Sequence, residues 1–302
     1  MILSHVAESV TIAVICLLAL NGLYRLLCSR PRIEVPAAPA TSYRYPKMAT
    51  QDTTDTFEIE GLRAYTLSKA GSAVNYDFFD VQNHCKNVVT FYLGDVSGKG
   101  ESAADCRSAC RSLLKHAARI SLDPAGVVAA VNETLASYEL DGRYATLLYG
   151  RLDLTSGRLL LLSAGHPNPI RISRRLDRTQ ILECSPCLPV GILTGHDYVV
   201  SGFSLLPGDT LLLYTDGITE ARDSNRQFFG EHNLMQVAHQ AHSPSPQALV
   251  DSILRRVDSF SPILCDDRTV MAITYVGLRS EYSTNRMEVN PAEVSRLSLC
   301  YN

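Results

Sequence analysis

The sequence has no stretch in which lysine and arginine gather with aromatic residues, and its formal net charge is only −3 over 302 residues. Nucleic-acid-binding domains usually carry such a basic patch, so we expect no nucleic-acid partner. An internal repeat and a long low-complexity tract are also missing, which gives no sign of a repeat architecture. Hydrophobic residues make up 46% of the chain and charged residues 20%, as in a globular protein with a substantial core.

The cysteines do not form the pattern of a disulfide framework. There are nine of them, an odd number, spread through apparent helices and strands. This distribution favours free thiols in a reducing compartment. Cys184 and Cys187 form a CxxC, but no second pair lies at zinc-ligand spacing. We therefore interpret them as loop cysteines, with a redox or zinc role as the weaker alternative.

A long apolar run covers residues 6–28, which is enough helix to cross a bilayer. Three arginines lie only toward its C-terminal side and one glutamate lies toward its N-terminal side: Arg25, Arg30, Arg32 and Glu8. The positive-inside rule then places the N-terminus outside and the rest of the chain in the cytoplasm. We expect residues 1–32 to be a single-pass anchor in the cell membrane. A signal peptide, an interfacial helix and a buried helix are the alternatives, and arginines that follow the run argue against the first.

The remainder is predicted to be one domain over residues 56–279, between a linker at 33–55 and a polar tail at 280–302. The linker is rich in proline, alanine, threonine and serine. Within the domain, strand-like runs, helical periods and a hairpin alternate in blocks, which indicates an α+β protein. We expect strands at 87–93, 144–153, 158–164, 210–214 and 269–276, and helices after Gly100, after Asp123, at 231–240 and at 245–259.

Four short acidic motifs lie in order along this domain, each at the edge of an apolar, strand-like run. They are Asn75-Tyr-Asp-Phe-Phe-Asp80, Leu93-Gly-Asp-Val-Ser-Gly-Lys-Gly100, Tyr214-Thr-Asp-Gly-Ile-Thr-Glu-Ala221 and Cys265-Asp-Asp-Arg-Thr269. Carboxylates gathered from distant segments suit a hard divalent cation such as Mg²⁺ or Mn²⁺. Two such ions can activate water and clamp a phosphoryl group.

Other interpretations of these motifs can be tested on the sequence. The segment around Lys99 is not a phosphate-binding P-loop, because Leu93 stands where glycine is needed and Gly100 follows the lysine. Ser97 is not a nucleophile elbow, because Asp95 and Lys99 replace its glycines. Taken singly, each acidic motif is also an ordinary turn or loop signal.

Together, the order and wording of the motifs resemble the SpoIIE-type branch of the metal-dependent type 2C (PPM) serine/threonine protein phosphatases. The resemblance runs from about Phe57 to Gly277. Other short segments of the chain also match the family, namely Tyr144-Ala-Thr-Leu-Leu-Tyr-Gly150, Ser163-Ala-Gly-His-Pro-Asn-Pro169, Leu206 to Gly217 and Phe229-Gly230. The resemblance implies an α-β-β-α sandwich of two antiparallel sheets flanked by helices, with two Mn²⁺ or Mg²⁺ ions at one end.

By position in the motifs, Asp95 resembles the carboxylate that bridges both metals, with the Val96 carbonyl as a neighbouring ligand. Asp216 and Asp266 resemble ligands of one metal. Asp77 matches the first acidic residue of the family, which helps to hold the other metal and its water. The resemblance therefore implies that Asp77 and Asp95 are catalytic.

Three accessory residues keep two interpretations each. Asp267 is a second candidate ligand or a neighbour of Asp266, His166 is a proton donor or a loop-shaping residue, and Lys99 steers phosphate or is solvated at a helix start. The sequence departs from the family at Asn75 and Tyr76, where two glycines usually stand. Tyrosine rarely adopts the backbone angles open to glycine, so the geometry around the first aspartate is in question. No arginine can be assigned as a phosphate clamp.

The resemblance implies hydrolysis of phosphoserine or phosphothreonine on a protein. In this family the substrate is typically a phosphorylated anti-sigma-factor antagonist, a STAS-domain protein of bacterial partner switching, and a homodimer is also in keeping with it. One rival is a pseudophosphatase that keeps the fold and binds a partner without catalysis. Another is hydrolysis of a small phosphorylated metabolite or nucleotide. Four converging carboxylates favour catalysis over a scaffold, because they repel one another without metal.

Overall fold

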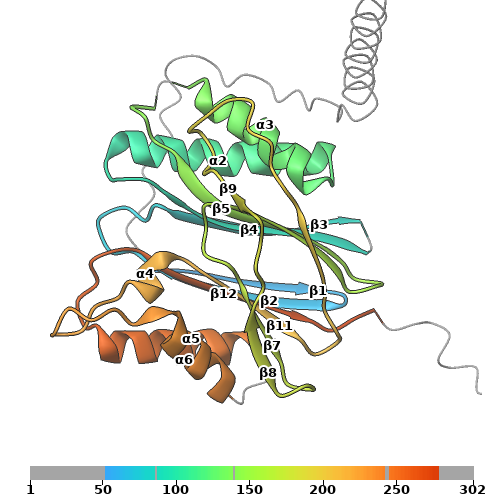
Figure 1. Cartoon of the computed structure of the whole chain (residues 1–302), viewed down its shortest axis with the longest axis vertical. Coiled ribbons are helices and arrows are strands. Elements are labelled where there is room, and N and C mark those ends of the chain that lie inside the picture. The colour runs from blue at the N-terminus through green and yellow to red at the C-terminus, as the bar shows by residue number, and fades with distance from the viewer. Residues whose placement is uncertain (1–51, 86, 139, 242–244, 279–302) are drawn as a thin grey trace, which may run out of the picture.

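The computed structural model describes residues 52–278 except 86, 139 and 242–244. In this part of the chain two six-stranded sheets face each other, and helices cover both outer faces (Figure 1). The four layers confirm the α-β-β-α sandwich that the resemblance implied. One detail differs, because the short strand β9 (Pro186–Cys187) pairs parallel with β6, so that sheet is not purely antiparallel.

The first sheet has the order β1-β2-β12-β11-β7-β8, and every neighbouring pair is antiparallel. Its strands are β1 Thr53–Ile59, β2 Leu62–Lys69, β12 Arg268–Tyr275, β11 Thr210–Tyr214, β7 Ile170–Ser173 and β8 Arg178–Ile181. β1 begins inside the segment 33–55 that we interpreted as a linker.

The second sheet has the order β10-β6-β5-β4-β3, with β9 beside β6. Its strands are β10 Ser201–Ser204, β6 Arg158–Ala164, β5 Ala145–Asp153, β4 Val88–Val96 and β3 Asp77–Cys85. β5 and β6 form the predicted hairpin. β3 is an edge strand, and it begins at the first aspartate of the acidic motifs.

Two helices cover each sheet, at the positions where the sequence predicted them. α2 (Glu101–Ile120) and α3 (Pro124–Ala136) lie over the second sheet, and α5 (Gly230–Gln240) and α6 (Pro246–Phe260) lie over the first (Figure 1). The Asp123 side chain accepts a hydrogen bond from the Gly126 amide, which caps the start of α3. A short helix, α4 (Asp216–Thr219), follows β11 at Asp216-Gly217, which taken singly is a turn signal.

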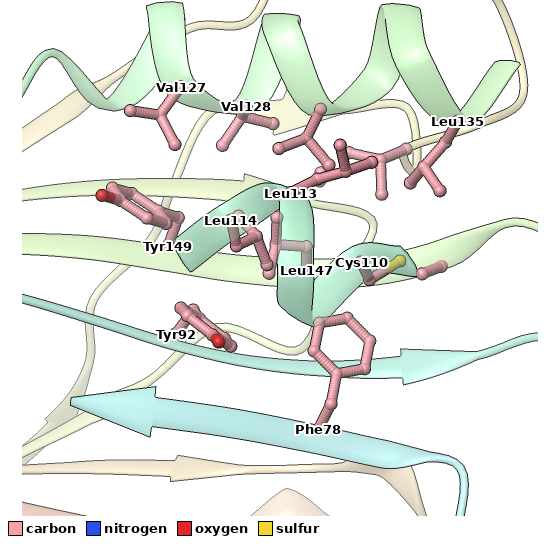
Figure 2. Close-up of a cluster of buried hydrophobic side chains, with 14 of the residues drawn as sticks. Phe78, Tyr92, Cys110, Leu113, Leu114, Val127, Val128, Leu135, Leu147 and Tyr149 are labelled. Carbon is pink, nitrogen blue, oxygen red and sulfur yellow. The ribbon is translucent and has the colours of Figure 1, made fainter. Parts of the chain in front are cut away.

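Three apolar cores hold these layers together. Side chains alternate between the two faces of each strand, so one strand contributes residues to two of these cores. Phe78 and Tyr92 point toward α2 and α3 and pack among the helix residues that Figure 2 shows. Phe79 and Phe91 point the other way, into the core between the sheets. Because both faces of β4 are covered, its residues are almost continuously buried. The third core lies between the first sheet and helices α5 and α6.

The expected membrane anchor at 1–32 and the tail at 280–302 lie outside the described residues. Within the described ranges, no helix is long and apolar enough to cross a membrane. Cys106, Cys110, Cys184, Cys187 and Cys265 are free thiols, as the scattered distribution of cysteines predicted.

Candidate active site

The two sheets bring the acidic motifs together at one end of the sandwich. Asp77 begins β3 and lies directly opposite Asp95, near the end of β4. Residues that face each other in an antiparallel pair project to the same side of the sheet, so these two carboxylates are neighbours. Asp77 is almost fully buried, with 1% of its surface exposed. The pairing therefore places a carboxylate pair at the rim of the second sheet.

Asp77 also connects the second sheet to the first. Its Oδ2 atom accepts hydrogen bonds from Thr215 Oγ1 at 3.0 Å and from Thr269 Oγ1 at 2.5 Å. Thr215 follows β11 and Thr269 lies at the start of β12. Both threonines belong to the acidic motifs, but nothing in the sequence marks their hydroxyls as partners of Asp77. They fix the Asp77 carboxylate across the gap between the sheets.

Asp216 and Asp266 come from the first sheet, at the end of β11 and just before β12. Their two loops touch at Gly217, where an added Cβ atom would lie 1.9 Å from the Asp267 carbonyl oxygen. Only glycine permits so close an approach. This contact holds Asp216 beside the Asp266 segment.

The carboxylates act on one another electrostatically. Burial raises the pKa of Asp95 to about 7, and the charges of Asp216, Asp266 and Asp267 act in the same direction. Burial and the charge of Asp95 raise the pKa of Asp77 well above its usual value. Burial and nearby carboxylates also raise the pKa of Asp216. Clustered carboxylates with raised pKa values are stabilised by a bound cation.

The donor chemistry fits a hard divalent cation. Asp77, Asp95, Asp216 and Asp266 supply carboxylate oxygens, and the Val96 carbonyl lies at the end of β4 beside them. Among the described residues, however, no three His, Cys, Asp or Glu side chains form a closed metal cage. The structure thus gathers the predicted ligands from both sheets without closing them around one point.

Asp267, whose role the sequence left open, binds backbone amides of the loop before β3. Its Oδ1 atom accepts a hydrogen bond from the Gly71 amide at 2.7 Å, and its Oδ2 atom accepts one from the Tyr76 amide at 2.5 Å. It is 5% exposed, whereas 62% of the Asp266 side chain is exposed. Asp267 therefore holds the loop that leads into β3, whereas the exposed Asp266 carboxylate is accessible to a cation.

The departure at Asn75 and Tyr76 does not displace Asp77. Asn75 Oδ1 accepts a hydrogen bond from the Asp77 amide at 2.9 Å, and the Tyr76 hydroxyl accepts one from the Gly100 amide at 2.7 Å. Neither residue is among the described non-glycine residues with positive φ. These two side chains therefore fix a loop whose backbone does not need the conformations reserved for glycine.

Positive charge lies at the rim of the site. Lys99 Nζ is 3.9 Å from Asp266 Oδ1, with 56% of its side chain exposed. Arg143 Nη1 lies 3.4 Å from the Ser97 carbonyl oxygen, and Arg107 Nε donates to the Asp77 carbonyl oxygen at 2.8 Å. From the sequence alone, no arginine could be assigned to this site. Arg107 lies on α2 and Arg143 just before β5, outside the acidic motifs, so only folding brings them to the site.

His166 lies one strand away from Asp95. Its Nδ1 atom is 2.9 Å from Thr146 Oγ1, and Thr146 faces Asp95 across β4 and β5. Ser163 Oγ donates to the His166 carbonyl oxygen at 2.6 Å. Burial lowers the pKa of His166 to about 3, so the imidazole is neutral near pH 7. These contacts favour the loop-shaping interpretation over proton donation.

Comparison with solved structures identifies this architecture as a PP2C-type fold. The PP2C phosphatase domain of SpoIIE from Bacillus subtilis, solved with a fragment of its regulatory domain, superposes with a TM-score of 0.63 at 18% identity. The match covers 75% of this chain and 72% of that one. At this identity the likeness shows the fold alone.

Sequence comparison gives the family. The family described as Stage II sporulation protein E (SpoIIE) matches residues 86–276, more than half of the chain, so the chain belongs to the SpoIIE family. Protein IcfG of Synechocystis sp. is 23% identical over 67% of this chain and 36% of its own length. Phosphoserine phosphatase RsbU of Bacillus subtilis is 26% identical over 62% of this chain and 56% of its own length. The match thus spans about a third of IcfG and about half of RsbU.

Proposed function

We propose that this protein hydrolyses phosphoserine or phosphothreonine on a protein substrate in a metal-dependent reaction. The observation that carries the proposal is the position of the four acidic motifs. Asp77 and Asp95 face each other on one sheet, and Asp216 and Asp266 come from the other sheet at the same end. Membership of the SpoIIE family supports the same activity.

Mg²⁺ or Mn²⁺ ions held by Asp77, Asp95, Asp216, Asp266 and the Val96 carbonyl would supply an activated water and neutralise phosphoryl charge. The residues of the chain orient and bind around them. Thr215 and Thr269 fix the Asp77 carboxylate, and Lys99 offers an exposed ammonium group to phosphoryl oxygens. His166 is neutral and buried, so the leaving oxygen takes its proton from solvent rather than from this side chain.

A phosphorylated STAS-domain anti-sigma-factor antagonist is the substrate that the family resemblance supports. The name of RsbU, a phosphoserine phosphatase, accords with such chemistry in a relative. A homodimer is part of the same proposal.

The test uses the full-length chain with a phosphoserine peptide and p-nitrophenyl phosphate while Mn²⁺ is titrated. We expect Mn²⁺-dependent turnover that Asp95→Asn abolishes. Asp105→Asn is the matched control, because Asp105 is an exposed acid on α2 outside the cluster. Turnover that Asp95→Asn leaves unchanged would contradict the proposal.

A partner-binding pseudophosphatase is the second candidate. The lack of a closed three-ligand cage among the described residues favours it. Titration calorimetry with Mn²⁺ separates the two candidates. No heat of Mn²⁺ binding, together with no turnover, would make the binding module the better account. Mn²⁺ binding that Asp95→Asn removes would support the enzyme.

We also propose that residues 1–32 anchor the protein in the cell membrane with the phosphatase domain in the cytoplasm. The apolar run at 6–28 and the arginines after it support this. The full-length protein should sediment with membranes and be released by detergent, and deletion of 1–32 should leave it soluble. Recovery of the full chain in the soluble fraction without detergent would overturn the anchor.

A further inference from the structure

A groove of about 750 Å³ lies beside β3, away from the carboxylates of the candidate site. One wall is the strand, over residues 80–84. The other wall is the C-terminal end of α2 and the residues after it, namely Lys115, Ala118, Arg119, Ile120, Ser121 and Leu122. In Figure 1, α2 passes across the outer face of the sheet above β3 and β4. The groove is therefore open along the edge of the sheet.

The strand wall has the features of a surface that accepts another strand. In the described part of the chain, β3 pairs with β4 and has no neighbour on its other side. Two side-chain contacts show which backbone groups point away from β4, because the Asp77 carbonyl accepts from Arg107 and the Val81 amide donates to Asp80 Oδ1 at 2.9 Å. A strand that pairs at Val81 therefore displaces the Asp80 carboxylate from this amide. Phe79 shares the alternation of Asp77 and Val81 and so turns its backbone groups the same way. Such an edge can pair with an extended peptide.

The helix wall carries positive charge. Lys115 and Arg119 are four residues apart and project from the same side of α2, and Arg111 and Arg107 continue that row toward Asp77. Within the described residues neither Lys115 nor Arg119 forms an ion pair. The carboxylate among the lining residues is Asp80, whose oxygens accept from the Val81 amide and from Gln82 Nε2. The groove thus presents two available cations to a ligand.

We propose that this groove binds an extended acidic segment of the phosphoprotein substrate, which adds as a strand to the edge of β3 while its carboxylates meet Lys115 and Arg119. Residues 80–84 span about 16 Å, room for roughly five extended residues. Asp77 lies three residues, or about 10 Å, further along the same strand. A segment bound along β3 therefore leads toward the carboxylate cluster, and this inference rests on the proposed phosphatase function.

Direct binding tests the groove independently of catalysis. The probes are fluorescein-labelled hexapeptides that alternate valine with glutamate, with glutamine or with lysine, and anisotropy is measured with the full-length chain. We expect the glutamate peptide to bind most tightly. The double variant Lys115→Glu with Arg119→Glu should weaken its binding about tenfold, because two exposed attractions become repulsions.

Two controls make the binding result specific. Arg255→Glu with Arg256→Glu makes the same charge change on α6, where both arginines are exposed, and should leave the affinity unchanged. N-methylation of alternate peptide amides should abolish binding if the peptide adds as a strand. Equal losses in both double variants, or a glutamate peptide that binds no better than the glutamine peptide, would overturn the proposed site.

Turnover then tests whether the ligand is the substrate. A phosphoserine joined to the glutamate segment should show a KM about tenfold below that of the glutamine version at equal kcat, and the groove variant should remove this difference while p-nitrophenyl phosphate turnover stays unchanged. Tight peptide binding with no effect on KM would overturn the substrate assignment. If neither phosphopeptide nor p-nitrophenyl phosphate is hydrolysed, the proposed function fails, while anisotropy still decides whether the groove binds acidic strands.

Discussion

At the scale of single residues, Tyr76 joins three segments that meet at the candidate site. Its amide donates to Asp267, its hydroxyl accepts from the Gly100 amide, and its ring packs in the core beneath α2. Gly100 precedes α2, where the structure shows no side-chain cap. The tyrosine hydroxyl therefore satisfies one of the amides that every helix start leaves without an intrahelical partner.

Replacement of Tyr76 by phenylalanine removes only this hydroxyl. We expect Tyr76→Phe to lower the free energy of unfolding by about 1 kcal/mol, because the Gly100 amide loses its acceptor. Urea denaturation measures the change. Tyr198→Phe is the matched control, because the buried Tyr198 hydroxyl has no hydrogen-bond partner among the described residues. Equal losses in the two variants would show that the Gly100 contact contributes nothing.

His166 makes a pH-dependent contribution to stability. Its pKa in the folded protein is about 3 because it is buried, whereas an unfolded histidine titrates near 6.5. Between these values the unfolded chain binds the extra proton, so stability falls as pH falls. Below about pH 6.5 the wild-type protein should lose roughly 1.4 kcal/mol per pH unit relative to His166→Asn. Chemical denaturation at pH 7 and pH 5 checks this, and parallel losses in both proteins would contradict it.

At the scale of elements, α6 holds the segment that carries Asp266 and Asp267. Asp258 on α6 forms ion pairs with Arg268 at 3.0 Å and with Lys69 at 2.6 Å. Arg268 is almost fully buried and also donates to the Ser261 and Ile263 carbonyl oxygens. This network fixes the start of β12 against the end of α6. It was missed in the sequence because Asp258 and Arg268 are ordinary surface residue types in both elements.

Asp258→Asn would leave the buried Arg268 guanidinium without its counter-ion. We expect a loss of about 1–3 kcal/mol in unfolding free energy and weaker Mn²⁺ binding, because the Asp266 segment loses its support. Thermal denaturation and Mn²⁺ calorimetry measure the two effects. Asp251→Asn is the control, since Asp251 lies on the same helix and forms no ion pair within the described residues. A normal Mn²⁺ affinity in Asp258→Asn would rule out the positioning role.

At the scale of the whole molecule, the candidate site lies where the ends of the two sheets meet. Both sheets contribute carboxylates there, and these repel one another. Burial and its neighbours raise the pKa of Asp95 to about 7, so above that pH the cluster is under electrostatic strain. The cores between the layers hold the carboxylates together against this repulsion. A divalent cation bound between the sheets would attract the carboxylates of both and so offset their repulsion.

The repulsion between the carboxylates predicts that Asp95→Asn affects stability differently without and with metal. In EDTA at pH 7.5, Asp95→Asn should raise the free energy of unfolding by about 1–3 kcal/mol, because a buried repelling charge is removed. With saturating Mn²⁺ the wild-type protein should gain stability and the variant should not. Melting temperatures with and without Mn²⁺ test both statements. Destabilisation of the metal-free variant would show that the cluster is not strained.

The sequence by itself predicted an α+β domain and its long elements, and its resemblance to a known family implied the layers and the candidate ligands. Periodicity predicted α2, α3, α5, α6 and the β5–β6 hairpin, because long elements with one buried face repeat their apolar residues regularly. The resemblance of the motif order supplied Asp77, Asp95, Asp216 and Asp266, since each of them lies within a short contiguous motif. Short elements such as α4 and β9 were not predicted, because two to four residues are too few to show a periodic apolar pattern.

Only the tertiary structure decided which contacts each of these residues makes. Asp266 and Asp267 are equivalent in the sequence, yet backbone amides from a segment about 190 residues away engage Asp267 and leave Asp266 exposed. Folding likewise buries His166, brings Arg107 to Asp77, and places Lys115 and Arg119 beside the free edge of β3. Contacts between distant segments depend on how sheets and helices pack, and no local pattern records that packing.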